Sequence, residues 1–341
     1  MWVEATRGGV VETRHRVHAA VVDSGGGLVA HAGDPDLVTF WRSGAKPFQA
    51  LPLVLDGVTE RFGMTQEELA LCCASHSSEP RHVELVRELL GKIGCSERDL
   101  LCGPHPPLSD RVAQDYASRG VRLTAVYSNC SGKHAGMLAL ARHHGWPVEF
   151  YTRPDHPVQQ RCLAEIAGWT GVAAPEIATA VDGCGVVCFA VPLRSMALAY
   201  GRLANAELGM RNAESTPDLP FRIPHSAFRI VEAMLRHPDL VAGDGRPCTD
   251  MMRAHPGRVV AKVGAAGVYC GLLPREGWGI ALKIEDGHGP AAVVAMAAML
   301  AELGLRPQPA HLVSQPIVNT RGETVGELRV NGGLARQKDA G

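Results

Sequence analysis

The chain carries a serine and a lysine three residues apart, in Ser43-Gly-Ala-Lys46. Lysine is scarce elsewhere, since only six of the 34 basic residues are lysines. Arginine stays charged in a protein, whereas a partly buried lysine can lose its proton and act as a base. If a helix begins here, the Lys46 amine lies within one turn of the Ser43 hydroxyl. The pattern predicts a serine nucleophile with a lysine base; the alternative is a Ser43 that only caps the helix.

A second lysine lies in Lys262-Val-Gly264, inside an apolar run that predicts a strand. A Ser-x-x-Lys motif followed by a Lys-bearing strand is typical of penicillin-recognising enzymes. Such sites also have a middle polar element, for which two segments qualify, Ser75-His-Ser77 and Tyr127-Ser-Asn129. The residue pattern alone leaves both open.

Two further segments are unusual in combining cysteines with polar residues and glycines: Cys130-Ser-Gly-Lys-His134 and Asp182-Gly-Cys-Gly185. Thiolates favour soft metals such as zinc. The two cysteines, with His134 or a neutral Lys133, could therefore bind zinc, although the chain has no Cys-x-x-Cys pair.

The bulk composition excludes several classes of partner. A net charge of -1 and a pI of about 6.9 indicate neither nucleic acid nor a membrane surface. The first residues lack the pattern of an export signal, so we expect a cytoplasmic protein. In that compartment the ten cysteines are expected to be reduced.

The order of predicted elements indicates one α/β (α+β) domain, an antiparallel sheet flanked by helices. The sheet part is expected at about 1–60 and 250–341, and the mostly helical part at about 61–249. A flexible insertion is expected at Asn205 to Pro224. The elements expected are a hairpin at 17–31, helices at 80–93, 131–142, 158–169, 225–236 and 289–303, and strands at 186–193, 259–273 and 279–284.

Several long motifs resemble the asparaginase II family, the rhizobial-type L-asparaginases. They are Arg42-Ser-Gly-Ala-Lys-Pro-Phe-Gln-Ala-Leu-Pro52, Cys73-Ala-Ser-His-Ser77, Asn129-Cys-Ser-Gly-Lys-His-Ala-Gly-Met137, Asp182-Gly-Cys-Gly-Val186, Val260-Ala-Lys-Val-Gly-Ala265 and Ala281-Leu-Lys-Ile-Glu-Asp-Gly287. The resemblance implies a fold like that of serine β-lactamases and penicillin-binding proteins. It also implies hydrolysis of L-asparagine to L-aspartate and ammonia by a homodimer.

The resemblance also implies roles for individual residues. Ser43 with Lys46, and Ser75 with Lys262, match the two Ser–Lys pairs of the family. This favours Ser75 over Tyr127-Ser-Asn129 as the middle element. The expected zinc ligands are Cys130, Lys133 and Cys184, and the expected substrate contacts are Arg42, Asn129, His134 and Asp182. Asp182 suits an α-amino group and Arg42 a carboxylate.

One position departs from the family pattern, because Ala266 stands where we expect an acidic residue. Activity or substrate specificity can therefore differ from that of the family, and two rival functions stay open. One is a penicillin-type serine acyltransferase or esterase. The other is a non-catalytic thiol or zinc sensor built on the same fold, using Cys130 and Cys184.

Overall fold

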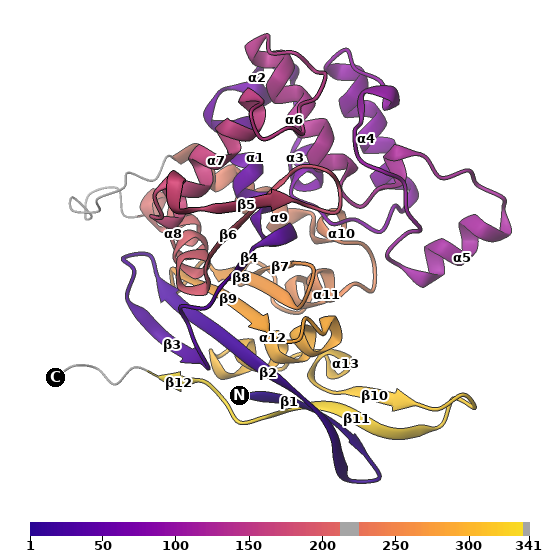
Figure 1. Cartoon of the computed structure of the whole chain (residues 1–341), viewed down its shortest axis with the longest axis vertical. Coiled ribbons are helices and arrows are strands. Elements are labelled where there is room, and N and C mark those ends of the chain that lie inside the picture. The colour runs from indigo at the N-terminus through magenta and orange to yellow at the C-terminus, as the bar shows by residue number, and fades with distance from the viewer. Residues whose placement is uncertain (212–224, 337–341) are drawn as a thin grey trace. The chain divides into compact units, whose positions relative to one another are not determined.

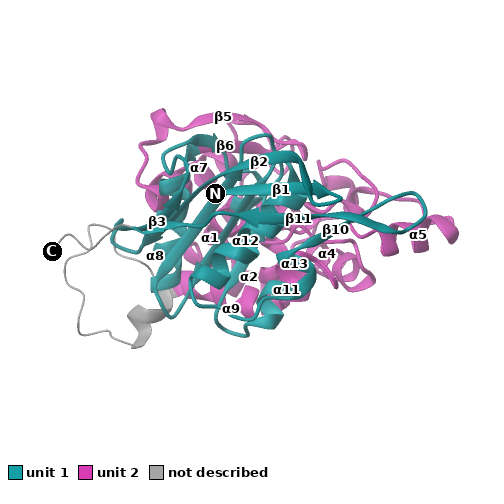
Figure 2. Ribbon diagram, turned by 90° about the horizontal axis from the view of Figure 1, so that it is seen from below, with its two compact units in different colours: residues 1–44, 191–208, 250–341 teal, residues 45–190, 209–249 magenta. Residues whose placement is uncertain are grey.

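The computed structural model describes residues 1–211 and 225–336 and divides the chain into two compact units. Unit 1 comprises 1–44, 191–208 and 250–341, and unit 2 comprises 45–190 and 209–249 (Figure 2). The expected sheet part ran to about residue 60 and omitted 191–208. In the structure the helix that begins at Lys46 packs among the helices of unit 2, while 191–208 packs against the sheet of unit 1.

The strands are β1 (Trp2–Arg7), β2 (Val10–Asp23), β3 (Leu28–Ala32), β4 (Val38–Phe40), β5 (Ala178–Val181), β6 (Val187–Pro192), β7 (Val260–Val263), β8 (Val268–Leu273), β9 (Trp278–Ile284), β10 (Gln315–Val318), β11 (Thr324–Asn331) and β12 (Ala335–Arg336).

The α-helices are α1 (Lys46–Leu55), α2 (Val58–Phe62), α3 (Gln66–Cys72), α4 (Pro80–Lys92), α5 (Asp110–Ser118), α6 (Ser131–His144), α7 (Pro157–Thr170), α8 (Leu193–Arg211), α9 (Phe228–Arg236), α10 (Pro238–Val241), α11 (Pro247–Ala254), α12 (Gly289–Glu302) and α13 (Ala310–Val313). Short 3-10 turns are η1 (Arg42–Ala45), η2 (Glu97–Asp99), η3 (Ala125–Tyr127), η4 (Ala174–Glu176) and η5 (His225–Ala227).

Unit 1 is built on an antiparallel sheet with the order β10-β11-β1-β2-β9-β8-β7, and β3 pairs with both β2 and β12. The first strand of the chain and a strand near its C-terminal end are neighbours in it, because β1 pairs with β11 (Figure 1). Strand β2 is long enough to pair first with β1 and then with β9. Its second half, from Val17 to Val22, is an almost wholly buried apolar run. This confirms the predicted mixed class, an antiparallel sheet with helices.

Helices α8 and α12 pack on this sheet. Gly279 in β9 permits the close approach of α8, since a Cβ there would lie 1.9 Å from the carbonyl oxygen of Ala197. Helix α12 packs against β1, β8, β9 and β11 and is apolar and buried along most of its length, including Ala291, Val294 and Met296. The strands β8 and β9 are almost wholly buried, and the burial of their apolar side chains stabilises this part of the sheet.

The single strand predicted over 259–273 is wrong, because the structure has two strands, β7 and β8, that pair as an antiparallel hairpin. The connecting turn contains Ala266 and Gly267 with φ of 54° and 72°. A left-handed backbone conformation cannot continue a strand. The helix predicted over 225–236 likewise begins as a 3-10 turn and becomes α-helical at Phe228.

Unit 2 is mainly helical, and α6 is its central element. A Cβ on Gly132 would lie 2.3 Å from the carbonyl oxygen of Leu71, and one on Gly136 would lie 2.9 Å from the sulfur of Cys72. These glycines allow α6 to lie directly against α3. The capping box predicted at Thr65 and Glu68 is present at the start of α3. The packing of α3 on α6 fixes the loop that follows α3, where Ser75 lies.

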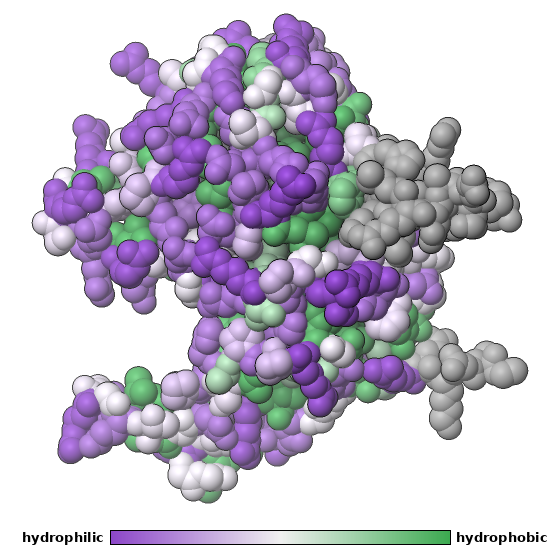
Figure 3. Space-filling view, turned by 180° about the vertical axis from the view of Figure 1, so that it is seen from behind, coloured by the Kyte–Doolittle hydropathy of each residue, from purple (hydrophilic) through white to green (hydrophobic). Residues whose placement is uncertain are grey.

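Polar and charged residues cover most of the face shown in Figure 3, with apolar residues in small groups between them. Among the described residues, no helix combines the length and the apolar character required to cross a bilayer. The predicted insertion falls partly in α8, and its residues 212–224 lie outside the described residues.

Candidate active site

Lys46 and Ser75 are in contact inside unit 2. Lys46 is the first residue of α1 and is fully buried. Its Nζ lies 3.0 Å from Oγ of Ser75 and donates to the carbonyl oxygen of Ala74 at 2.5 Å. Both partners of this lysine, a hydroxyl and a peptide carbonyl, are uncharged groups. A buried amine touching a serine hydroxyl is the arrangement that a Ser–Lys proton transfer requires.

Ser43 lies in the 3-10 turn η1, just before α1, and is partly exposed. The N-cap of α1 is Ala45, with no side-chain cap. Ser43 therefore does not cap this helix, which removes the alternative reading of the motif. The start of the helix after Ser43 is confirmed, whereas the pairing of Ser43 with Lys46 stays a prediction.

Unit 1 holds the segment that carries Ser43 through buried hydrogen bonds. Trp41 Nε1 donates to the sulfur of Cys270 at 3.3 Å, and the Tyr200 hydroxyl donates to the carbonyl oxygen of Gly44 at 2.7 Å. Gly44 has no room for a side chain, since a Cβ would lie 2.8 Å from the Trp41 ring. The backbone around Ser43 is thus fixed by packing against β8 and α8.

Lys262 is buried in β7, where it lies opposite Cys270 in the register with β8. Its Nζ donates to the carbonyl oxygen of Val263 at 3.0 Å. The strand predicted for this lysine is confirmed, and its partnership with Ser75 stays a prediction.

The loop from Ser75 to Ser78 is a buried polar segment joined to the start of α6. His76 is fully buried; its Nε2 lies 2.9 Å from Oγ of Ser131, and its Nδ1 accepts from the N–H of Ser78 at 3.1 Å. The His76 N–H also donates to the carbonyl oxygen of Asn129. The two candidate middle elements, Ser75–Ser77 and Tyr127–Asn129, therefore lie side by side.

The histidines around this loop were not predicted to have a role. Burial, reinforced by His82 and Lys46 nearby, holds the pKa of His76 well below its usual value. His105 Nε2 lies 2.9 Å from Oδ1 of Asn129 and accepts from the Asn129 N–H. No spacing in the sequence links these residues, since only the fold brings them together.

Cys130, Lys133 and Cys184 form a thiol–amine cluster. Lys133 Nζ lies 3.0 Å from Sγ of Cys184. A hydrogen bond from the Cys130 thiol and the charge of Lys133 lower the pKa of Cys184 to about 4, against the effect of burial. The same hydrogen bond, together with burial, raises the pKa of Cys130 to about 11. Burial lowers the pKa of Lys133, but its attraction to Cys184 and Cys130 outweighs this and raises it overall. Cys184 is therefore a thiolate beside an ammonium group.

The donor set of the thiol–amine cluster fits zinc. It offers two sulfurs and the nitrogen of Lys133, which lies 3.0 Å from Sγ of Cys184 and would bind a metal only after losing its proton. Thiolate sulfur and neutral nitrogen are ligand types that zinc prefers. No group of three or more His, Cys, Asp or Glu side chains suited to a metal occurs among the described residues. A zinc site here would accordingly depend on the lysine nitrogen, as expected from the sequence.

His134 lies one position after Lys133 in α6 and is fully buried. Its Nδ1 lies 2.6 Å from the hydroxyl of Tyr151, which is also fully buried. Burial, with the charge of Lys133, lowers the pKa of His134 to about 3, so the imidazole is neutral. Tyr151 was not predicted from the sequence, because it lies 17 residues away on a different element.

Asp182 lies in the turn between β5 and β6. Its N–H donates to the carbonyl oxygen of Val186, and its Oδ1 accepts from the N–H of Gly183 at 2.8 Å. The carboxylate is near enough to Lys133 to raise the pKa of that lysine. The turn therefore presents Asp182 and Cys184 together.

Arg42 is partly exposed with φ of 54° in unit 1, and its substrate contact stays a prediction.

Ala266, the departure from the expected pattern, lies at the tip of the β7–β8 hairpin. Lys283 Nζ donates to its carbonyl oxygen at 2.7 Å. The contact uses the backbone, so this lysine is held here without the carboxylate expected at position 266.

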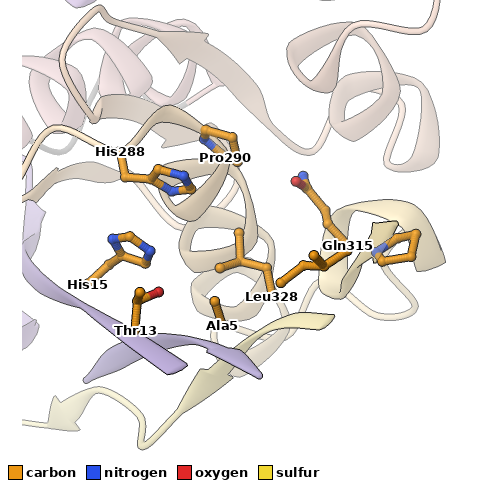
Figure 4. A pocket seen from close by; sticks show the side chains of 9 residues that line it. Ala5, Thr13, His15, His288, Pro290, Gln315 and Leu328 are labelled. Carbon is orange, nitrogen blue, oxygen red and sulfur yellow. The ribbon is translucent and has the colours of Figure 1, made fainter. Parts of the chain in front are cut away.

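A cavity of about 370 Å³ lies within unit 1, where the imidazoles of His15 and His288 stack on one side and Gln315 lies on the other (Figure 4). The residues that line it are Ala5, Thr13, His15, His288, Pro290, Gln315, Pro316, Ile317 and Leu328. It includes none of the predicted catalytic, substrate or metal residues and is not the candidate active site.

Comparison with known proteins identifies the family. The model of the L-asparaginase II family matches residues 3–330. The chain therefore belongs to the L-asparaginase II family, as the motifs indicated. Membership in this family places it among the hydrolases.

Two solved structures are similar to this chain at low sequence identity. A β-lactamase from Mycobacterium bovis has 15% identity and a TM-score of 0.38, with 84% of this chain and 94% of that chain covered. A penicillin-binding protein homologue from Pyrococcus abyssi, an octamer, has 12% identity and a TM-score of 0.34, with 95% and 84% covered. No curated protein matches the chain.

Proposed function

We propose that this protein hydrolyses L-asparagine to L-aspartate and ammonia by a Ser–Lys mechanism. The observation that carries the proposal is the buried contact between Lys46 and Ser75 in a member of the L-asparaginase II family. Burial against a serine hydroxyl removes water from around the Lys46 amine, which is costly for a charged group. A lysine that only formed a structural ion pair at the surface would not need this placement.

In the proposed reaction, a serine oxygen attacks the side-chain amide carbon, and the Lys46 amine accepts the serine proton. The C–N bond then breaks, and the departing nitrogen takes a proton to leave as ammonia. Water hydrolyses the resulting aspartyl ester and regenerates the serine. We assign the attack to Ser43, and we assign proton relay to Ser75, whose hydroxyl touches Lys46, and to Lys262.

The remaining residues bind the substrate in this proposal. Asp182 pairs with the α-ammonium group and Arg42 with the α-carboxylate, because each offers the opposite charge. Asn129 and His134 offer neutral hydrogen-bonding groups. Zinc, held by Cys130, Lys133 and Cys184, would act as a Lewis acid that orients the substrate.

Ammonia release by the purified protein tests the proposal, with L-asparagine and L-glutamine as substrates. We expect activity on asparagine that is lost in Ser43→Ala and kept in Ser118→Ala, a control serine whose hydroxyl donates to the carbonyl of Asp115. A burst of ammonia equal to the enzyme concentration, absent in Ser43→Ala and present in Ser75→Ala, identifies Ser43 as the nucleophile. The reverse pattern assigns that role to Ser75. Absence of any amide hydrolysis contradicts the proposal.

A second candidate function is a thiol or zinc sensor, and the low pKa of Cys184 favours it. Redox-dependent binding of a partner without amide hydrolysis would support it. Covalent labelling of Ser43 by a penicillin would instead support the acyltransferase or esterase alternative. The homodimer and the cytoplasmic location stay predictions. Sedimentation of the purified protein tests whether it is a homodimer.

A further inference from the structure

Tyr151 and His134 form a buried pair whose protons can be placed from the hydrogen bonds alone. The Tyr151 hydroxyl lies 2.6 Å from Nδ1 of His134 and accepts from the N–H of Leu101 at 3.0 Å. The two rings meet edge to face, with centroids 5.5 Å apart. Both side chains are fully buried.

A tyrosine hydroxyl has one proton to donate. Of its two neighbours in the described part of the chain, the Leu101 N–H can only donate, so the acceptor left for that proton is Nδ1 of His134. A neutral imidazole that accepts at Nδ1 carries its own proton on Nε2. Tyr151 thereby selects one of the two tautomers of His134.

The Nε2 atom of His134 is buried and has no hydrogen-bond partner among the described residues. A buried donor left unpaired is destabilising, and such groups in native structures commonly have a functional reason. Because Nδ1 and Nε2 lie on different sides of the ring, Nε2 faces away from Tyr151. The charges of Lys133 and Cys130 act on the imidazole, so His134 lies in the neighbourhood of the thiol–amine cluster.

We propose that Tyr151 is a positioning residue that holds His134 as the Nε2–H tautomer, so that His134 donates a hydrogen bond to a carboxylate or carbonyl oxygen of the bound substrate. A protonated Nε2 has no lone pair for a metal. This tautomer therefore excludes Nε2 of His134 as a metal ligand. The tautomer follows from this chain alone, whereas the substrate contact rests on the proposed function.

Nitrogen NMR of ¹⁵N-histidine-labelled protein tests the tautomer directly, on the protein as purified and with its zinc content measured. The His134 signals are those that disappear in His134→Gln. We expect a directly bonded proton on Nε2 and an unprotonated Nδ1, and we expect the same pattern with zinc added. A proton on Nδ1, or a zinc-bound Nε2, would overturn the proposal even if the variants described next fail to fold.

Tyr151→Phe removes the hydroxyl and keeps the ring. We expect signals of the second His134 tautomer to appear, and KM for asparagine to rise about 3- to 10-fold, the loss of roughly one hydrogen bond. The matched control is Tyr116→Phe, which removes a buried hydroxyl that donates to the carbonyl oxygen of Ser78 and does not touch His134. An unchanged tautomer in Tyr151→Phe, or an equal change in the control, contradicts the proposal. If the protein does not hydrolyse asparagine, the NMR result still decides the tautomer, so the two failures are distinguishable.

Discussion

Nζ of Lys46 lies 3.0 Å from Oγ of Ser75, although 29 residues separate them in the chain. Lys46 opens α1 and Ser75 follows α3, so their contact depends on how these two helices pack with α6. The glycine at position 136 allows that packing, since a Cβ there would meet Cys72 of α3 and Leu53 of α1. The position of Lys46, the proposed base, is therefore set by the core of unit 2.

Replacing Lys46 by arginine should lower kcat for asparagine by about 10²- to 10⁴-fold, because arginine cannot lose its proton and act as a base. Steady-state ammonia release measures this. Lys92→Arg is the matched control, since Lys92 is a partly exposed lysine that pairs with Glu68. A Lys46→Arg enzyme with the kcat of the control would show that Lys46 is not the base.

Cys184 should react as a thiolate at unusually low pH. Its pKa of about 4 means that the thiolate persists as the pH falls, and is lost only near pH 4. In zinc-free protein, we expect alkylation by iodoacetamide at pH 6 on Cys184, located by peptide mass spectrometry. The modification should vanish in Cys184→Ser and persist in Cys95→Ser, a control cysteine of intermediate exposure. Alkylation that begins only near pH 8 would contradict the assignment.

The buried histidine His76 should make the protein sensitive to acid. Its pKa is lowered in the folded state, so the unfolded chain binds more protons once the pH falls below about 6.5. Stability is thus retained above that pH and lost below it, by up to about 1.4 kcal/mol per pH unit for this group.

Urea unfolding at pH 7.5, 6.0 and 5.0 measures this dependence. His76→Gln keeps a donor toward Ser131 but does not titrate, so its free energy of unfolding should fall less steeply with acid. The control is His311→Gln, because His311 is exposed and lies 2.9 Å from the partly buried carboxylate of Asp250. Equal slopes in wild type and His76→Gln would rule out His76 as a source of acid sensitivity.

Gly132→Ala should destabilise the protein, since the added Cβ would lie 2.3 Å from the carbonyl oxygen of Leu71 and force α6 away from α3. We expect a loss of about 1–3 kcal/mol in the free energy of unfolding. Gly91→Ala is the matched helical control, because a Cβ there meets nothing within 4 Å, and should stabilise by about 0.5–1 kcal/mol. Similar urea midpoints for the two variants would show that α6 and α3 are not closely packed.

The sequence by itself determined the family, the mixed α/β class and the elements that carry the motifs. Ser43 before a helix, and Lys262 on a strand, follow from local spacing, because helix starts and strands leave short-range patterns of capping, apolar period and turn residues. Motif resemblance grouped Cys130, Lys133 and Cys184; the structure shows that Lys133 contacts Cys184, and the role of the three as zinc ligands stays a prediction.

Only the tertiary structure decided which side chains touch. The contact of Lys46 with Ser75, the bond of His76 to Ser131 and the pairing of His134 with Tyr151 each join separate elements. The turn at Ala266 and Gly267, which splits one apolar run into β7 and β8, was likewise invisible in the pattern. Periodicity reports the local backbone, whereas contacts between distant residues, and the burial that shifts the pKa of His134 and Cys184, arise only when the helices and strands pack together.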